Sequence, residues 1–205
     1  MKIDRRKNYY IVFDTETTNG LGDPIVYDLG FAIIDKKGNI YETHSLIIRE
    51  VFYGMKDLMQ SAYYANKIPK YKEQIANGER KVVSLFEARK TFSEVCEKYN
   101  VKVAIAHNAR FDYRSTSKTQ RYLTKSKYRF FLPYGIELWD TMRMANDTIC
   151  KQVTYKRWCL KNGYMTKNNQ VRKTAEILYR YISGQNDFVE SHTGLEDVLI
   201  EKEIF

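Results

Sequence analysis

Two carboxylates stand two residues apart at the end of the first apolar stretch of the chain. Residues 9–13 are expected to form a short buried strand, and Asp14 and Glu16 follow directly. Because the side chains of an extended chain alternate between two faces, both carboxylates would project to the same side. Two like charges there repel each other unless divalent cations lie between them, since hard cations prefer carboxylate oxygens. Metal chemistry and an ordinary polar loop therefore both remain open.

Two later stretches carry residues of the same chemical kind. His107 to Asp112 follows an apolar run, 101–106, and His192 to Asp197 opens an expected helix. The three stretches read F-D-T-E-T-T-x-G, H-N-A-x-F-D and H-x-x-x-x-D in chain order. In this order and phrasing the sequence resembles the DEDD family of 3′→5′ exonucleases. A histidine five residues before the last aspartate marks the DEDDh, or DnaQ-like, branch, which has bacterial and phage-borne members.

The resemblance covers most of the chain and implies a fold. We expect an α/β ribonuclease H-like fold in residues 1–205, forming a single exonuclease domain. Its central five-stranded mixed sheet, with three antiparallel strands and then two parallel ones, would be flanked by helices. The last helix of the family usually runs further than the one expected here.

The resemblance also implies the roles of the site residues. The ligands of two Mg²⁺ ions, which Mn²⁺ should replace, are expected to be Asp14, Glu16, Asp112 and Asp197. Two such ions activate a water molecule and neutralise charge on the scissile phosphate. His192 would be the general base, because an ordinary histidine titrates near about 6.5. Substrate contacts are expected from Thr17, His107 and Asn108, with His107 in a structural or positioning role.

The residues also predict individual elements. Strands are expected at 25–34, 40–48, 101–106 and 136–139, and helices at 84–99, 174–182 and 194–205. Ser84 and Glu87 form a capping-box pattern at the start of the 84–99 helix. That helix should bury Leu85, Phe86, Phe92 and Val95. Residues 51–68 have helical spacing that Pro69 should end, and Asp140 is expected to cap a further helix.

The overall charge favours a polyanionic partner. The chain has 205 residues, a formal net charge of +9 and a pI near 9.3. Residues 113–136 contain six basic residues and no acid, and residues 148–175 contain seven basic residues and no acid. These stretches are either walls of a groove for phosphates or solvated helix faces. The sequence does not show which residues would touch phosphate.

The leading interpretation is a magnesium-dependent 3′→5′ exonuclease that releases nucleoside 5′-monophosphates from single-stranded DNA. The alternatives are a 3′→5′ exoribonuclease acting on short RNA and a nucleic-acid-binding module without activity. The expected partners are single-stranded DNA or RNA 3′ ends and, for proofreading, a separate DNA polymerase. Three cysteines without a paired spacing and no long apolar run favour a cytoplasmic protein without a membrane partner.

Overall fold

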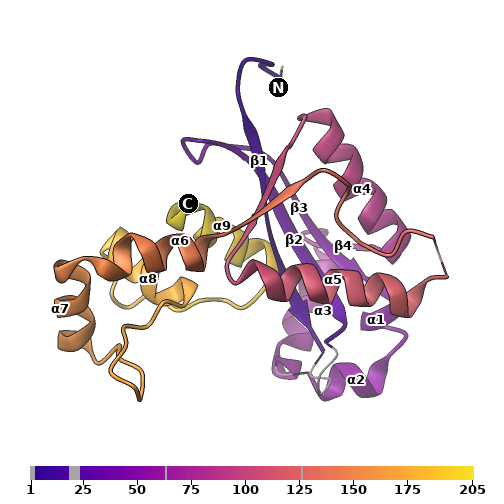
Figure 1. The fold of residues 1–205 in the computed structure, drawn as a ribbon. Coiled ribbons are helices and arrows are strands. Elements are labelled where there is room, and N and C mark those ends of the chain that lie inside the picture. Colours follow the sequence, from indigo (N-terminus) through magenta and orange to yellow (C-terminus); the bar gives the residue numbers. More distant parts are fainter. Residues whose placement is uncertain (1–2, 19–23, 63, 126) are drawn as a thin grey trace.

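The core of the molecule is one mixed β-sheet with helices on both faces (Figure 1). The computed structural model describes residues 3–18, 24–62, 64–125 and 127–205. In these residues the sheet has six strands in the order β4-β3-β2-β1-β5-β6. Their bounds are β1 Tyr9–Thr17, β2 Val26–Asp35, β3 Ile40–Ile48, β4 Lys81–Val83, β5 Val103–Ala106 and β6 Glu137–Asp140.

The pairing of the strands confirms the expected α/β class. β1, β2 and β3 are antiparallel neighbours, and β5 and β6 continue the sheet in parallel with β1. The expected count of five strands is wrong, because β4 adds a sixth at the edge beside β3. This strand has only three residues, so its sequence carries no alternation that could predict it.

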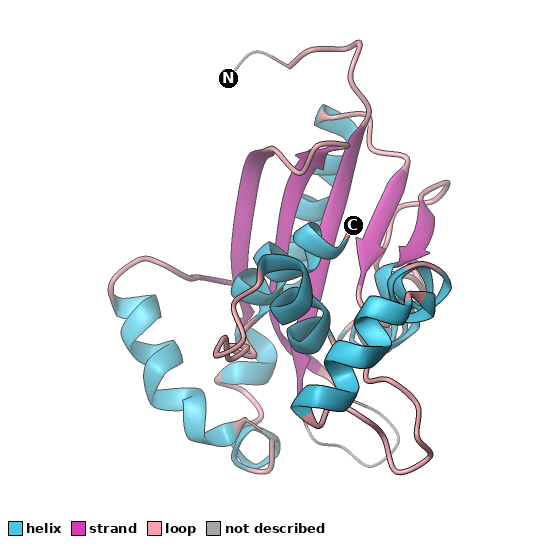
Figure 2. Cartoon of the chain, turned by 90° about the vertical axis from the view of Figure 1, so that its left-hand side faces the viewer, coloured by secondary structure: helices cyan, strands magenta, loops and turns pink. Residues whose placement is uncertain are grey.

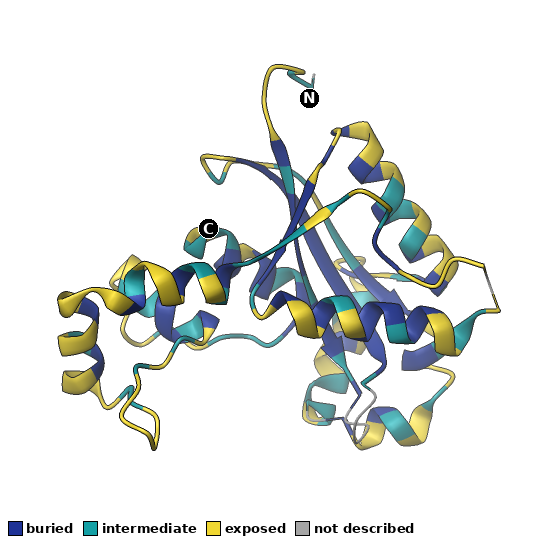
Figure 3. Ribbon diagram, in the orientation of Figure 1, coloured by how far each residue is buried: buried dark blue, intermediate teal, exposed yellow. Residues whose placement is uncertain are grey.

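Helices cover the two faces of the sheet unequally (Figure 2). One face packs against α4, Leu85–Lys98, and α5, Ala109–Leu123, in the larger apolar core. The other face is covered near β1 and β2 by α9, Gly194–Ile204, through Val198. Every residue of β2 is buried for this reason (Figure 3).

Two of the helical predictions near the sheet need correction. The α4 capping box forms as expected, but Phe86 is 73% exposed because it lies on the outer side of the first turn. Residues between β3 and β4 form short helices, not one: α1 Arg49–Phe52, α2 Lys56–Gln60, η1 Ala65–Lys67 and α3 Ile68–Ala76. Pro69 lies in the first turn of α3, where its missing N–H costs nothing, so it begins a helix.

A second, smaller apolar cluster lies beside the sheet. It is built by α6 Thr141–Asp147, η2 Ile149–Lys151, α7 Val153–Asn162 and α8 Ala175–Ser183, around the buried Tyr155 and Leu178. Figure 1 shows α7 and α8 well to one side of the sheet. Within the described residues, no helix is long and apolar enough to cross a membrane.

Candidate active site

The parallel pairing of β1 and β5 brings two of the three motifs to one end of the sheet. β1 remains extended through Thr17, so Asp14 and Glu16 lie on the same face of the strand. Asp112 lies in the first turn of α5, which directly follows β5. The hydroxyl of Thr15 donates a 2.8 Å hydrogen bond to the Asp112 carboxylate. The first two motifs are therefore in direct contact through Thr15 and Asp112.

The third motif arrives through an unusually close contact between α9 and β2. A Cβ atom on Gly30 would lie 2.1 Å from the carbonyl carbon of Gly194, so the two backbones touch. Gly30 is the register partner of Asp14 in the sheet. The first turn of α9, which carries Asp197, is thus held against the strand pair that carries Asp14 and Glu16. Any larger side chain at Gly30 would move this helix.

A buried ion pair fixes the same helix end. Asp28, fully buried, accepts 2.9 Å hydrogen bonds from the backbone N–H of Gly194, the hydroxyl of Tyr71 and the guanidinium of Arg80. Arg80 also pairs at 2.7 Å with Glu196 of α9. This network joins β2, α3 and the start of α9. Sequence reasoning missed it, because Asp28, Tyr71 and Arg80 lie outside the motifs, and Gly194 and Glu196 occupy positions that the third motif leaves unspecified.

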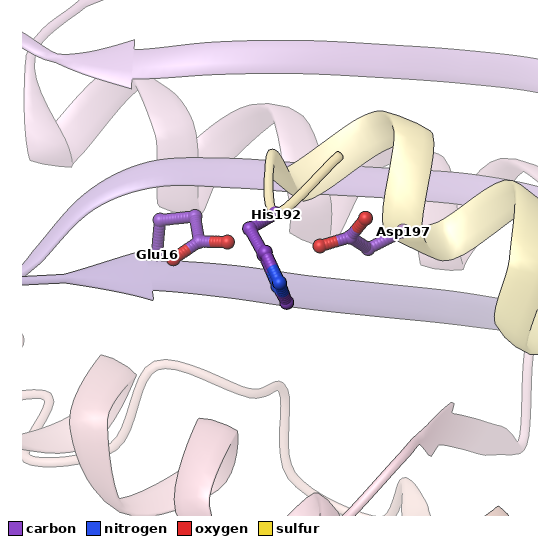
Figure 4. Close-up of side chains that lie close together, drawn as sticks. All are labelled: Glu16, His192 and Asp197. Atoms are coloured by element: carbon purple, nitrogen blue, oxygen red, sulfur yellow. The ribbon is translucent and has the colours of Figure 1, made fainter. Parts of the chain in front are cut away.

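Glu16, His192 and Asp197 form a compact cluster of possible metal ligands (Figure 4). One ligand atom from each lies within 4.8 Å of the others. Glu16 is 9% exposed and Asp197 4% exposed. Burial raises the pKa of Glu16 to about 8 and that of Asp197 to about 9, and neighbouring carboxylates add to both shifts. The negative charges of Glu16 and Asp197 are therefore not balanced by nearby positive charges.

The two remaining motif carboxylates share this electrostatic environment. Burial raises the pKa of Asp112 to about 7, although the hydrogen bond from Thr15 opposes the shift. The pKa of Asp14 is raised well above its usual value by burial and by Glu201, Asp112, Asp197 and Glu16. Such groups become favourable as anions when a cation lies between them.

Glu201 is a further buried carboxylate that the motifs did not indicate. It lies on α9 one helical turn after Asp197 and is 3% exposed. Its Oε2 atom has no hydrogen-bond partner among the described residues, and burial raises its pKa well above the usual value. The signal available in the sequence was the four-residue spacing from Asp197 on an expected helix.

His192 is held by contacts on two sides. Its ring stacks on Tyr64, with centroids 4.6 Å apart and an angle of 15° between planes. Its Nδ1 lies 3.6 Å from a carboxylate oxygen of Glu190. The backbone of His192 has φ 49°, and Lys67 donates to the carbonyl oxygens of Ser191 and His192. Burial, together with Lys67, lowers the pKa of His192, which favours the neutral imidazole.

The expected substrate-contact residues occupy different environments. Thr17 ends β1 and is partly exposed. Asn108 is exposed, has a left-handed backbone with φ 63°, and donates its N–H to Asp140, which caps α6 as expected. Both ring nitrogens of His107 have partners, the Thr141 hydroxyl at 2.9 Å and the Lys173 carbonyl at 2.8 Å. His107 therefore connects α5 to α6 and to the chain before α8.

Comparison with solved structures places this architecture among exonuclease I folds. The chain is 15% identical to a moderately thermophilic exonuclease I from Methylocaldum szegediense, with a TM-score of 0.56 and 96% of the chain covered. E. coli exonuclease I was also found in two forms. Its zinc-bound complex with single-stranded DNA gives 12% identity and a TM-score of 0.49, and its complex with a dT13 oligonucleotide gives 10% and 0.48, each over 96% of this chain.

These likenesses concern the fold. The chain spans 39% of the length of each of these proteins. No protein-family model matches the sequence, and no curated protein matches it either. The likeness shows that the mixed sheet and its helices share the fold of the exonuclease I from Methylocaldum szegediense.

Proposed function

We propose that this chain is a metal-dependent 3′→5′ exonuclease that hydrolyses single-stranded DNA to nucleoside 5′-monophosphates, with residues 1–205 as one exonuclease domain. The observation that carries the proposal is the cluster of Glu16, His192 and Asp197 at one end of the sheet, with Asp14 and Asp112 close enough to interact electrostatically with these acids. Their order matches the three motifs of the DEDDh exonucleases. The fold shared with exonuclease I supports the same class of reaction.

The donor set fits magnesium. Asp14, Glu16, Asp112 and Asp197 offer only oxygen ligands, and burial leaves them with little compensating positive charge. Bound Mg²⁺ would neutralise charge on the phosphate and lower the pKa of the attacking water. Mn²⁺ prefers the same ligands and should replace Mg²⁺ in activity assays.

His192 acts as the general base in this proposal. The Glu190 carboxylate beside Nδ1 favours the tautomer with its proton on that nitrogen, which leaves Nε2 to accept a proton from water. Stacking on Tyr64 limits rotation of the ring. Thr17 and Asn108 hold the terminal nucleotide, and His107 fixes the loop that carries Asn108.

Degradation of end-labelled strands tests the proposal. The wild-type protein should shorten 5′-labelled single-stranded DNA stepwise from the 3′ end with Mg²⁺, release nucleoside 5′-monophosphates, and stop with EDTA. Asp197→Asn should be inactive, whereas Asp147→Asn, an exposed matched control on α6, should match wild type. A strand with a 3′-phosphate should resist.

Three results would contradict the proposal. Cleavage of circular single strands would show an endonuclease, and faster degradation of RNA of matched sequence would show an exoribonuclease. Strand binding without any hydrolysis in Mg²⁺ or Mn²⁺ would leave a binding module.

A further inference from the structure

Four basic side chains follow one side of α5. Arg110, Arg114, Lys118 and Arg121 are separated by four, four and three residues, the spacing that places side chains in a row along a helix. Four residues of α-helix rise by about 6 Å, which is on the scale of one nucleotide in an extended strand. Asp112, on the same helix, is 2% exposed and points instead towards β1.

The same four side chains line a hollow of about 560 Å³. Its other lining residues are Pro24, Asn108, Phe111 and Ser115, so no acidic side chain borders it among the described residues. The ion pairs found in the described part of the chain include none from Arg110, Arg114 or Arg121. Cations so close together repel one another, and a polyanion removes that repulsion.

The hollow and Asp112 share the first turn of α5. Asn108, which directly precedes α5, borders the hollow, and Asp112 in that turn interacts electrostatically with Asp14. From Asp112 to Arg121 the helix rises by about 14 Å, so the row of cations leads away from the cluster for the length of a few nucleotides. Phe111, 41% exposed, offers an aromatic face on which a base can stack.

We propose that this hollow on α5 binds the phosphates of a single strand on the 5′ side of the nucleotide being removed. The placement of the 3′ end relies on the proposed exonuclease function, whereas the binding of single strands does not. Contacts to phosphate carry no base information, so sequence preference at the hollow is weak. The acid-free stretch at 148–175 supplies none of the lining residues.

Binding measured without catalysis tests the hollow directly. Fluorescence anisotropy in EDTA, with a labelled single strand of about 16 nucleotides, compares wild type with Arg114→Gln/Arg121→Gln. The double variant should bind about 5- to 20-fold more weakly at low salt, and its slope of log K against log salt should be smaller by about 1.4. The matched control, Lys36→Gln/Lys37→Gln, removes two exposed charges from the β2–β3 turn and should behave as wild type.

A second readout separates strand binding from catalysis. The p-nitrophenyl ester of thymidine 5′-monophosphate occupies only the scissile position, so the double variant should hydrolyse it within about twofold of wild type. Its KM for the long strand should rise. The charge-retaining variant Arg114→Lys/Arg121→Lys should keep most of the affinity and salt slope, which shows that the loss is not caused by misfolding.

Each other outcome has a definite meaning. If the double variant and the control have equal slopes of log K against log salt, the proposal that the hollow binds phosphates is refuted. The exonuclease proposal is then unaffected. Loss of ester hydrolysis together with binding would place these arginines in the catalytic centre and also overturn it. Salt-dependent binding that requires Arg114 and Arg121, in a wild-type protein with no hydrolysis, would support the hollow and end the exonuclease proposal.

Discussion

The two ends of the β1–β2 pair each bury acidic side chains, but they treat them in opposite ways. At the end where β1 begins, Asp35 is 3% exposed and accepts hydrogen bonds from Lys7, Tyr41 and Asn39. Burial opposes ionisation of Asp35, but these donors outweigh it and lower the pKa. These donors satisfy the Asp35 carboxylate, so it needs no bound cation.

At the other end, burial is not offset by donors. Glu16, Asp112 and Asp197 all have raised pKa values, and burial is the leading cause of each shift. Asp112 has the Thr15 hydroxyl as a partner, but the cluster contains more acids than donors. The difference separates a carboxylate that stabilises the fold from carboxylates that need a cation.

Removing a carboxylate from each end gives the largest expected contrast. Asp14→Asn should lower kcat by about 10⁴-fold or more, because it removes one of the proposed metal ligands. Asp35→Asn should leave kcat within about twofold of wild type, since its partners lie at the far end of the sheet. Single-turnover hydrolysis of labelled DNA measures both, and equal losses in the two variants would abolish the distinction.

His192 tests whether catalysis at this end uses a base as well as a metal. His192→Ala should reduce turnover by on the order of 10²–10⁴-fold, while metal affinity and strand affinity stay close to wild type. The acidic limb of the pH–rate profile should change shape. Isothermal titration with Mn²⁺ provides the comparison: lost metal affinity would make His192 a ligand, and full turnover would remove it from the mechanism.

Metal binding should stabilise the folded protein through the carboxylates at the end of β1, and Asp35 should play no part in this effect. A cation present at about 100 times its Kd adds about 2.7 kcal/mol to the free energy of unfolding. For a chain of this size that corresponds to a rise in Tm of about 5–10 °C. Asp35→Asn should keep this rise and Asp14→Asn should lose most of it in thermal melts. A wild-type melting curve that is unchanged across a wide Mg²⁺ and Mn²⁺ titration would refute the metal site.

The pH dependence of stability should also have opposite signs at the two ends. Raised pKa values of about 7, 8 and 9 for Asp112, Glu16 and Asp197 mean that the metal-free fold holds extra protons. Their contribution to stability is present at low pH and is lost as pH rises through that range. The lowered pKa of Asp35 contributes stability above its ordinary value that is lost as pH falls.

Denaturant melts in EDTA from pH 3 to 9 can separate these two limbs. Asp35→Asn should flatten the acidic limb, and Asp197→Asn should flatten the alkaline fall. A stability of the metal-free wild type that increases between pH 6 and 9 would contradict the sign given for the site carboxylates.

The smallest effect is expected at Glu201, which lies one helical turn after the proposed ligand Asp197. Glu201→Gln removes one of several mutually repelling carboxylates and should stabilise the metal-free protein by about 1 kcal/mol. Activity should remain within about tenfold of wild type. Urea melts in EDTA and single-turnover assays measure the two effects. A loss of activity as large as that of Asp14→Asn would show that Glu201 is itself a ligand.

Local patterns predicted the parts of the fold that depend on neighbouring residues. The apolar runs at 25–34 and 40–48 became β2 and β3 with nearly the expected bounds. Ser84 with Glu87 and Asp140 cap helices as their positions indicated, because a cap needs only the next turn of backbone. The motif residues were found because their spacing is also local.

Other features depended on contacts between distant segments. The sequence of β4 is too short to indicate a strand until β3 lies beside it. Gly30 and Gly194 are 164 positions apart, and nothing local shows that their backbones touch. The two acid-free stretches look alike in composition, yet only the row on α5 lines the hollow beside Asn108. Composition sets the number of cations, but the packing of α5 against the sheet decides where they face.

The chemistry of the candidate site divides in the same way. The types and order of Asp14, Glu16, Asp112, His192 and Asp197 are properties of the chain, and their resemblance to the DEDDh exonucleases predicts metal-dependent phosphodiester hydrolysis. The raised pKa values of the four carboxylates, the stacking of Tyr64 on His192 and the additional buried carboxylate of Glu201 arise only when α9 closes over β1 and β2. Desolvation and charge repulsion act through space, so they depend on which segments the fold brings together.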